Sequence, residues 1–221
     1  MFTGLIETIG TIRAISPKGE VIEVTVEAPS IAGELHLGDS VSLSGVCSTV
    51  TFFDSRRFKV ELMPETQMRT TFGAARSGTK LNLERAMRAD SRLDGHMVAG
   101  HVDGTCTVRN IETLGITRKI FFAAGEDLLS GIVEKGSVTV DGVSLTVIDA
   151  REDFFSVGVI PATLAETTIG LLKTGDRVNI ETDMIGKYIK KFLSDRYGSK
   201  NDGEKMKNTL TWDKLTEYGW S

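Results

Sequence analysis

Two histidines in a glycine-rich stretch form the densest group of polar residues in the sequence that are able to do chemistry. His96 and His101 are five residues apart in Gly95-His96-Met97-Val98-Ala99-Gly100-His101-Val102-Asp103-Gly104. An imidazole gains and loses a proton near neutral pH, and glycine lets another group approach the backbone closely. The spacing is not that of zinc ligands, and the sequence has no Cys-x-x-Cys pair. Spacing alone fits either proton transfer or ordinary hydrogen-bonded surface and linker histidines.

Cys47, Ser144 and Asp183 are the other side chains with nucleophilic or acid–base potential. A cysteine reacts as its thiolate only where a positive charge or a donor stabilises it, and most free cysteines simply fill a core. Both interpretations remain open for Cys47, whereas Cys106 is predicted to be a core residue. Asp183 follows a predicted strand and opens a predicted helix, where an acidic residue also serves as a cap.

The elements that must position these residues come in two copies. Residues 40–50 align with residues 137–147 at a shift of 97, with six of the eleven pairs identical. The same shift carries Pro64 onto Pro161, and Asn82 and Glu84 onto Asn179 and Glu181. A constant offset over separate blocks indicates a duplicated domain rather than coincidence. Cys47 and Ser144 occupy equivalent positions in the two copies.

Short alternating segments separated by Gly and Asp predict a β protein. Residues 21–27, 58–62, 80–84 and 177–181 alternate between apolar and polar side chains, as half-buried strands do. The spacing of the turn signals favours antiparallel barrels or sandwiches over βαβ units. Short helical turns are predicted after Pro64 and Pro161, because proline suits the first helical position.

The repeat and the patterning together predict the domain boundaries. Residues 1–88 form an N-terminal barrel, 89–97 a polar linker, 98–182 a C-terminal barrel, 183–197 an amphipathic helix and 198–221 a polar tail. The apolar stripe of the helix includes Met184, Ile185, Ile189 and Phe192, and the first repeat has no counterpart. This stripe can pack on the protein's own barrels or on another subunit, and we favour the subunit. Residues around Trp212 and Trp220 form either a short terminal helix or a tail.

Composition excludes several classes of protein. The 221 residues carry a net charge of −4, which provides no basic field for nucleic acid or anionic membranes. No apolar run reaches membrane-spanning length, and the first residues do not resemble a signal peptide. Two cysteines do not make a disulfide framework, so the cytoplasm is the expected compartment. There is also no dinucleotide-binding glycine motif, P-loop or nucleophile elbow.

Several motifs in order resemble the riboflavin synthase family, the type that dismutates lumazine. They cover residues 1 to about 195 and include Met1-Phe2-Thr3-Gly4-Leu5-Ile6-Glu7, Ser44-Gly45-Val46-Cys47, Met63-Pro64-Glu65-Thr66, the histidine stretch, Asp141-Gly142-Val143-Ser144-Leu145-Thr146-Val147, Ile160-Pro161-Ala162-Thr163-Leu164 and Asp183-Met184-Ile185-Gly186-Lys187-Tyr188. The resemblance implies two tandem Greek-key β-barrels, each binding one 6,7-dimethyl-8-ribityllumazine, and a helix that helps to form a homotrimer. It implies a site between the N-terminal barrel of one subunit and the C-terminal barrel of the next. It also implies four-carbon-unit transfer that gives riboflavin and 5-amino-6-(ribitylamino)uracil, the last step of riboflavin biosynthesis, without a metal or redox cofactor.

The same resemblance assigns the site residues. The catalytic set is Cys47, His101, Ser144, Thr146 and Asp183, with Cys47 contacting substrate opposite the other four. The resemblance implies that backbone groups of Gly4–Ile6, Cys47–Thr49, Gly100–Val102 and Ser144–Thr146 bind the pteridine edge, and that Glu61–Thr66 and Val159–Leu164 reach the ribityl chain. The substrate-binding set is Phe2, Thr3, Gly4, Leu5, Ile6, Cys47, Ser48, Thr49, Glu61, Leu62, Met63, Pro64, Glu65, Thr66, Gly100, His101, Val102, Lys135, Ser144, Leu145, Thr146, Val159, Ile160, Pro161, Ala162, Thr163 and Leu164.

Three positions depart from the family pattern. Ser44 stands where the family often has Asn, Ser48 where it usually has Leu, and Asp94 where Gly often precedes Gly-His. A rival hypothesis is a non-catalytic lumazine- or flavin-binding antenna-type protein, relatives of which tend to lose the paired histidines, the polar set of the second barrel and the helix. This chain keeps all three. A flavin-dependent reductase barrel is disfavoured, because the Arg-x-Tyr-Ser pattern that holds a flavin phosphate is missing.

Overall fold

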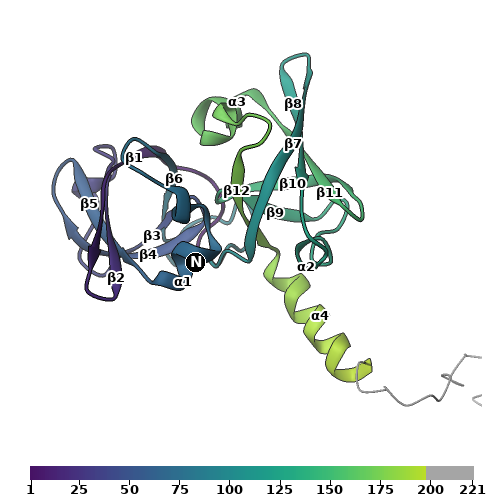
Figure 1. The fold of residues 1–221 in the computed structure, drawn as a ribbon, viewed down its shortest axis with the longest axis horizontal. Coiled ribbons are helices and arrows are strands. Elements are labelled where there is room, and N and C mark those ends of the chain that lie inside the picture. The colour runs from purple at the N-terminus through teal and green to yellow at the C-terminus, as the bar shows by residue number, and fades with distance from the viewer. Residues whose placement is uncertain (198–221) are drawn as a thin grey trace, which may run out of the picture. The chain divides into compact units, whose positions relative to one another are not determined.

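The computed structural model describes residues 1–197 and contains two closed, six-stranded antiparallel barrels and a C-terminal helix (Figure 1). The predicted mainly β fold with duplicated barrels is confirmed. The predicted tail 198–221, with Trp212 and Trp220, lies outside the described residues. No helix in the described part of the chain is long and apolar enough to cross a membrane.

The first barrel has the strand order β1-β2-β5-β4-β3-β6. Its elements are β1 (Thr8–Lys18), β2 (Val21–Glu27), η1 (Ala32–Glu34), β3 (Ser40–Leu43), β4 (Val46–Phe53), β5 (Arg57–Leu62), α1 (Pro64–Arg69), η2 (Thr71–Ala74) and β6 (Lys80–Arg85). Strands β3, β4 and β5 pair in succession, and β2 lies beside β5 after a longer connection. This arrangement is a Greek key, as predicted.

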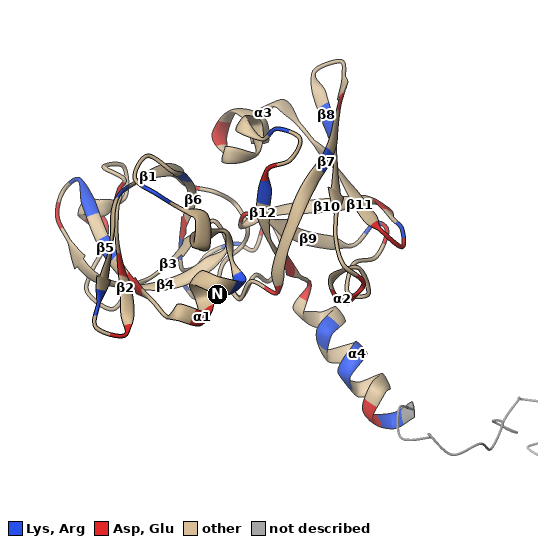
Figure 2. Ribbon diagram, in the orientation of Figure 1, with Lys and Arg blue, Asp and Glu red and all other residues tan. Residues whose placement is uncertain are grey.

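The second barrel has the same topology. Its elements are β7 (Gly104–Leu114), β8 (Thr117–Ala123), α2 (Glu126–Leu129), β9 (Ser137–Val140), β10 (Val143–Ala150), β11 (Phe154–Val159), α3 (Pro161–Glu166), η3 (Thr168–Leu171) and β12 (Arg177–Thr182). Both predicted turns after proline are helices with the proline in the first turn. Acidic and basic residues are interspersed over the strands of both barrels (Figure 2).

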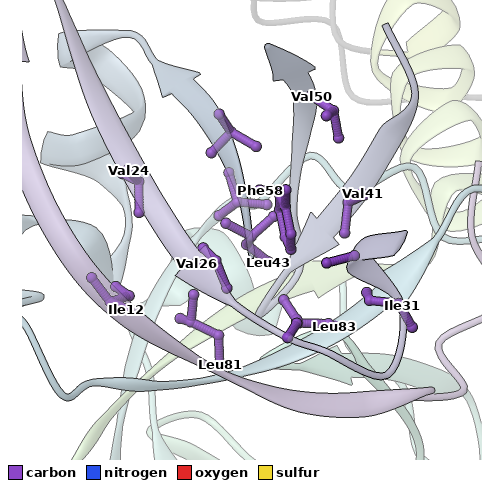
Figure 3. Packing of buried hydrophobic residues seen from close by; sticks show 14 of the residues in the cluster. Ile12, Val24, Val26, Ile31, Val41, Leu43, Val50, Phe58, Leu81 and Leu83 are labelled. Atoms are coloured by element: carbon purple, nitrogen blue, oxygen red, sulfur yellow. The ribbon is translucent and has the colours of Figure 1, made fainter. Parts of the chain in front are cut away.

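Each barrel encloses its own apolar core. In the first barrel, Ile12, Val24, Val26, Phe58 and Leu83 are completely buried and converge on the barrel axis (Figure 3). The second barrel has an equivalent core around Ile120, Phe122 and Phe155. Cys106 belongs to this core, as predicted, and burial raises the pKa of its thiol to about 12. The alternation of buried and exposed positions then sends every second side chain of a strand to the outer surface of the barrel.

A reciprocal set of hydrogen bonds joins the two barrels. Asn82 Nδ2 donates to the carbonyl of Asp141 at 2.9 Å, and Asn179 Nδ2 donates to the carbonyl of Ser44 at 2.9 Å. The amide oxygens of Asn82 and Asn179 accept from the Thr168 and Thr71 backbone N–H groups. Because Asn82 and Asn179 are equivalent in the repeat, the interface has an approximate twofold symmetry. Each amide is buried with its donor and acceptor both satisfied.

The chain continues after β12 into helix α4 (Met184–Tyr197). Asp183 precedes the helix, and its carboxylate accepts the backbone N–H of Ile185 at 2.9 Å, as a capping residue does. Lys187, one turn later, forms an ion pair with Asp103 at 2.7 Å. The helix carries exposed apolar side chains at Ile185, Ile189 and Phe192, so its predicted apolar stripe is present.

Candidate functional site

The segment before the first strand of each barrel crosses to the other barrel. The Ser144 N–H, in the C-terminal barrel, donates to the Gly4 carbonyl at 2.8 Å. The Cys47 N–H, in the N-terminal barrel, donates to the Gly100 carbonyl at 2.8 Å. The predicted binding residues therefore form two groups, and each group contains residues from both repeats.

Glycine is required at both crossing points. Gly4 and Gly100 have φ angles of +77° and +79°. A Cβ on Gly4 would lie 2.6 Å from the Cβ of Ser144, and a Cβ on Gly100 would lie 2.6 Å from the Cβ of Cys47. Any other residue would push the crossing segment away from the barrel, because real Cβ atoms do not approach other atoms so closely.

Two buried glutamates hold the crossing segments in place. Glu84 accepts the Thr3 N–H at 2.6 Å and the Gly4 N–H at 3.0 Å. Glu181 accepts the Ala99 N–H at 2.7 Å and the N–H groups of Gly100 and His101, each at 2.9 Å. Burial raises the pKa of both carboxyl groups, and these hydrogen bonds act in the opposite direction. The two glutamates are equivalent in the repeat, so both crossing segments are held by the same kind of hydrogen bonds from backbone N–H groups to a buried carboxylate.

The group on the C-terminal barrel contains a hydrogen-bonded histidine and serine. Nδ1 of His96 lies 2.7 Å from Oγ of Ser144. Burial lowers the pKa of His96, and the negative charge of Asp183 partly opposes this effect. Thr146 follows Ser144 by two positions on β10 and therefore faces the same side of the strand. Ser144 and Thr146 therefore lie side by side on β10, and Asp183 acts electrostatically on the histidine that contacts Ser144.

The group on the N-terminal barrel centres on Cys47, which is half-buried on β4. Thr49 faces the same outer side of this strand, whereas Ser48 points inward and is buried. The Ser48 hydroxyl donates to the carbonyl of Val46 at 3.3 Å, so a polar group occupies a core position that Leu145 fills in the other barrel. His101 is exposed and follows Gly100 on the segment that contacts Cys47.

The remaining predicted binding residues lie at the strand ends next to these groups. Glu61, Leu62, Met63, Pro64, Glu65 and Thr66 run from the end of β5 into α1, and Val159, Ile160, Pro161, Ala162, Thr163 and Leu164 run from the end of β11 into α3. Lys135 has a φ of +64°, and its N–H donates to the carbonyl of Val147. Phe2 is fully buried and exchanges backbone hydrogen bonds with Val98.

Both groups lie on accessible surface in the single chain. Leu5, Met63 and Ile160, three large apolar members of the predicted binding set, are 48 %, 65 % and 58 % exposed. A cavity of about 660 Å³ lies elsewhere, between the barrels, and is lined by Ser44, Asp141, Thr71 and Thr168 among others. It includes neither Cys47 nor Ser144. The candidate site is therefore formed by the hydrogen-bonded groups around Cys47 and Ser144, outside this cavity.

The sequence-based site set omits three residues that the structure brings into it. His96 has no role in that set, although it belongs to the histidine stretch, and it contacts Ser144. Glu84 and Glu181 are matched by the repeat, and a charged residue at the same position of two buried strands is a usable signal. What the pattern does not indicate is that each glutamate binds a segment that leads to the opposite barrel.

Comparison with known proteins identifies the family and the fold. A family model described as a lumazine-binding domain matches residues 3–86 and again residues 99–183. Proteins named riboflavin synthase from Actinobacillus pleuropneumoniae and Bacillus subtilis are each 41 % identical over 220 residues, covering 100 % of both chains. The crystal structure of LumP complexed with riboflavin has a TM-score of 0.75 at 26 % identity and covers 82 % of this chain and 99 % of that one. LumP complexed with 6,7-dimethyl-8-(1'-D-ribityl) lumazine, at 23 % identity and a TM-score of 0.74, shares the fold.

Proposed function

This chain belongs to the riboflavin synthase family, and we propose that it converts two molecules of 6,7-dimethyl-8-ribityllumazine into riboflavin and 5-amino-6-(ribitylamino)uracil. The observation that carries the proposal is the pair of crossed groups around Cys47 and Ser144. A dismutation consumes two copies of one molecule in two different roles, donor and acceptor of the four-carbon unit. Two related but chemically different pockets suit such a reaction.

The proposed roles follow the two groups. Ser144, Thr146 and Asp183 carry out proton transfer and nucleophile activation from the C-terminal barrel, together with His101. Cys47 contacts the second lumazine from the N-terminal barrel. Backbone groups of the crossing segments bind the pteridine edges, Lys135 helps to hold the lumazine of the C-terminal barrel, and residues around Pro64 and Pro161 reach the ribityl chains. Stacking of the two rings supplies proximity, which is a large part of the rate enhancement in bimolecular reactions.

We further propose that the complete site forms between subunits of a homotrimer. In one chain, His101 lies on the segment that contacts Cys47, whereas Asp183 lies near the histidine–serine pair of the other barrel. This separation supports a site in which the N-terminal barrel of one subunit faces the C-terminal barrel of its neighbour, so that His101 and Ser144 act on the same pair of substrates. The exposed apolar residues Leu5, Met63 and Ile160, and the apolar stripe of α4, are surfaces that such an assembly would cover.

The free cysteines Cys47 and Cys106 support a reducing compartment, and we expect the enzyme to act in the cytoplasm.

The alternative, a non-catalytic lumazine- or flavin-binding protein, has the same fold. It is less well supported, because full-length identity to proteins named riboflavin synthase is 41 % and identity to LumP is 23 to 26 %.

The decisive experiment is to incubate the purified, ligand-free protein with 6,7-dimethyl-8-ribityllumazine, without metal or nucleotide, and to follow the absorbance of riboflavin. We expect riboflavin and the pyrimidinedione to appear in equal amounts. Bound lumazine that persists unchanged would contradict the proposal and favour the binding protein.

A further inference from the structure

The turn between β9 and β10 carries one side-chain oxygen more than the turn itself requires. Asp141 Oδ1 accepts the Asn179 N–H at 2.8 Å. Ser44, the counterpart of Asp141 in the first barrel, accepts the Asn82 N–H at 3.2 Å with its single hydroxyl oxygen. The two turns have the same left-handed backbone, with φ of 46° at Ser44 and 45° at Asp141. One oxygen is therefore enough to hold such a turn, and the second carboxyl oxygen of Asp141 is left for another partner.

This second oxygen is open to the cavity of about 660 Å³ between the barrels, which Asp141 lines. Among residues 1–197 it has no hydrogen-bond partner, although Asp141 is only 8 % exposed. The hydroxyl of Thr168, also 8 % exposed and on the same cavity, has none either in this part of the chain. No side-chain nitrogen or oxygen that is sealed from solvent lacks a partner in the described residues, so both oxygens must reach the cavity. A ligand that bonds to both would satisfy two polar groups of an otherwise buried surface.

Two basic side chains that are equivalent in the repeat lie on the exposed part of the same lining. Lys80 opens β6 and donates to the Thr11 hydroxyl at 2.8 Å, and Arg177 opens β12 and donates to the Thr105 hydroxyl. Within residues 1–197, neither cation forms an ion pair with an acidic side chain. Asp176, the acidic residue beside them, accepts a backbone N–H of its own loop. The exposed lining therefore carries more positive than negative charge, which suits an anionic group.

Much of the remaining lining is apolar. Phe72 belongs to the core of the first barrel, and Leu172 packs against the core of the second. Met68 on α1 and Leu171 on η3 come from opposite barrels and are largely exposed. Apolar side chains from both barrels can thus contact the faces of a flat ring. A cavity of this volume is in the range that holds a ligand of mononucleotide size.

We propose that the cavity between the barrels is a second ligand site, separate from the groups around Cys47 and Ser144, for a planar heterocycle that has a ring N–H beside a carbonyl and an anionic substituent. A pyrimidine nucleotide has this chemistry. The ring N–H donates to the second oxygen of Asp141, and the Thr168 hydroxyl donates to the adjacent carbonyl. The phosphate pairs with Lys80 or Arg177. Binding involves no covalent step, and the ligand would contact both barrels at once.

Isothermal titration of the full-length, ligand-free protein with uridine 5′-monophosphate tests the inner part of the site. The titration is made at pH 8, above the pKa of about 7 that burial gives Asp141, so that the carboxylate accepts the ring N–H. Asp141→Ser keeps one oxygen for the Asn179 N–H, as Ser44 does in the first barrel, and removes the second. Thr168→Val removes only the unpartnered hydroxyl and keeps the backbone bond to Asn82. We expect each substitution to weaken binding by about tenfold.

The anionic part of the site is tested with a second pair of variants and with uridine. Lys80→Gln and Arg177→Gln should each weaken uridine 5′-monophosphate binding by at least about threefold, and uridine itself should bind at least about tenfold more weakly than the nucleotide. Arg13→Gln is the matched control, because it makes the same change of charge at a residue that does not line the cavity. Its affinity should stay within about twofold of the wild type.

Three results would overturn the proposal. The first is an absence of uridine 5′-monophosphate binding to the wild-type protein at millimolar concentration. The second is equal binding by the wild type and Thr168→Val, the variant that carries the test if Asp141→Ser does not fold. The third is complete displacement of the nucleotide by 6,7-dimethyl-8-ribityllumazine, which would place it in the lumazine pockets. Because these titrations measure binding and not riboflavin formation, their outcome is independent of the proposed function.

Discussion

The buried carboxyl group of Asp141 should make the stability of the protein depend on pH. It lies in the β9–β10 turn at the barrel interface, where burial raises the pKa of its carboxyl from 3.8 to about 7 despite the N–H donated by Asn179. An acid with a raised folded-state pKa binds more protons in the folded state, so stability falls as the pH rises from about 4 to 7 and stays lower above 7. The full difference corresponds to roughly 4 kcal/mol.

We therefore expect Asp141→Asn to raise the melting temperature at pH 8 and to have little effect below pH 4. Asparagine keeps the acceptor for Asn179 and tolerates the positive φ of 45° at this position. Ser44→Asn is the matched control, because Ser44 occupies the same turn of the first barrel at φ 46° and has no titrating group. Thermal unfolding of the three proteins from pH 4 to pH 8 would measure this. Equal pH dependence in wild type and Asp141→Asn would contradict it.

A substitution of Gly4 would test how closely the crossing segment must approach the C-terminal barrel. Gly4→Ala should weaken lumazine binding or turnover by at least about tenfold, because the new methyl group would overlap Ser144. Gly19→Ala is the control, since Gly19 also has a positive φ, of +61°, but has open space around it. The control therefore carries the backbone strain without the clash. If the two variants lose equal activity, strain rather than contact with Ser144 is responsible.

At the level of elements, the crossing segments connect the two barrels. We therefore expect a substitution in one barrel to weaken a backbone hydrogen bond in the other. In Glu84→Gln, an amide NH₂ group replaces one carboxylate oxygen and faces the N–H donors of Thr3 or Gly4. The segment should then loosen, and with it the hydrogen bond from Ser144 in the opposite barrel. Glu181→Gln should loosen the bond from Cys47 in the same way.

Amide hydrogen exchange measures these two effects separately. We expect Glu84→Gln to speed exchange at Ser144 and leave Cys47 protected, and Glu181→Gln to do the reverse. Each variant is the matched control of the other, because the two glutamates are equivalent in the repeat. Faster exchange confined to the barrel that carries the substitution would show that the crossing segments are not held by these side chains.

At the level of the whole molecule, a site between subunits makes a prediction about mixed assemblies. His101→Gln and Ser144→Ala should each inactivate the enzyme. When trimers are allowed to exchange subunits, an interface between the N-terminal barrel of a Ser144→Ala chain and the C-terminal barrel of a His101→Gln chain contains no substitution. About one quarter of the interfaces in a random mixture are of this kind, so the mixture should regain roughly that share of wild-type activity.

The control is a mixture of Ser144→Ala and Asp183→Asn, both on the C-terminal barrel, which should regain nothing because every interface keeps one substitution. Riboflavin formation before and after subunit exchange is the measurement. A site contained within one chain would give no recovery in either mixture. Recovery in both mixtures would be inconsistent with the assignment of these residues to one barrel.

The amino-acid sequence by itself determined the two barrels, because its signals for them are local. Alternation in residues 21–27 and 177–181, and prolines 64 and 161 at helix starts, require only the geometry of a strand or a helical turn. The shift of 97 residues indicated the duplication, and the motifs carried the family resemblance. Most of the candidate site residues came with these motifs.

Only the tertiary structure decided which residues share a pocket. Gly4 belongs to the first repeat but contacts Ser144 of the second, and Glu84 reaches Thr3 across 81 residues of chain. The pairing of His96 with Ser144 likewise depends on where the linker attaches after both barrels have formed. Contacts between residues so distant in sequence impose no period of two or 3.6 on their neighbours, so pattern alone does not reveal them.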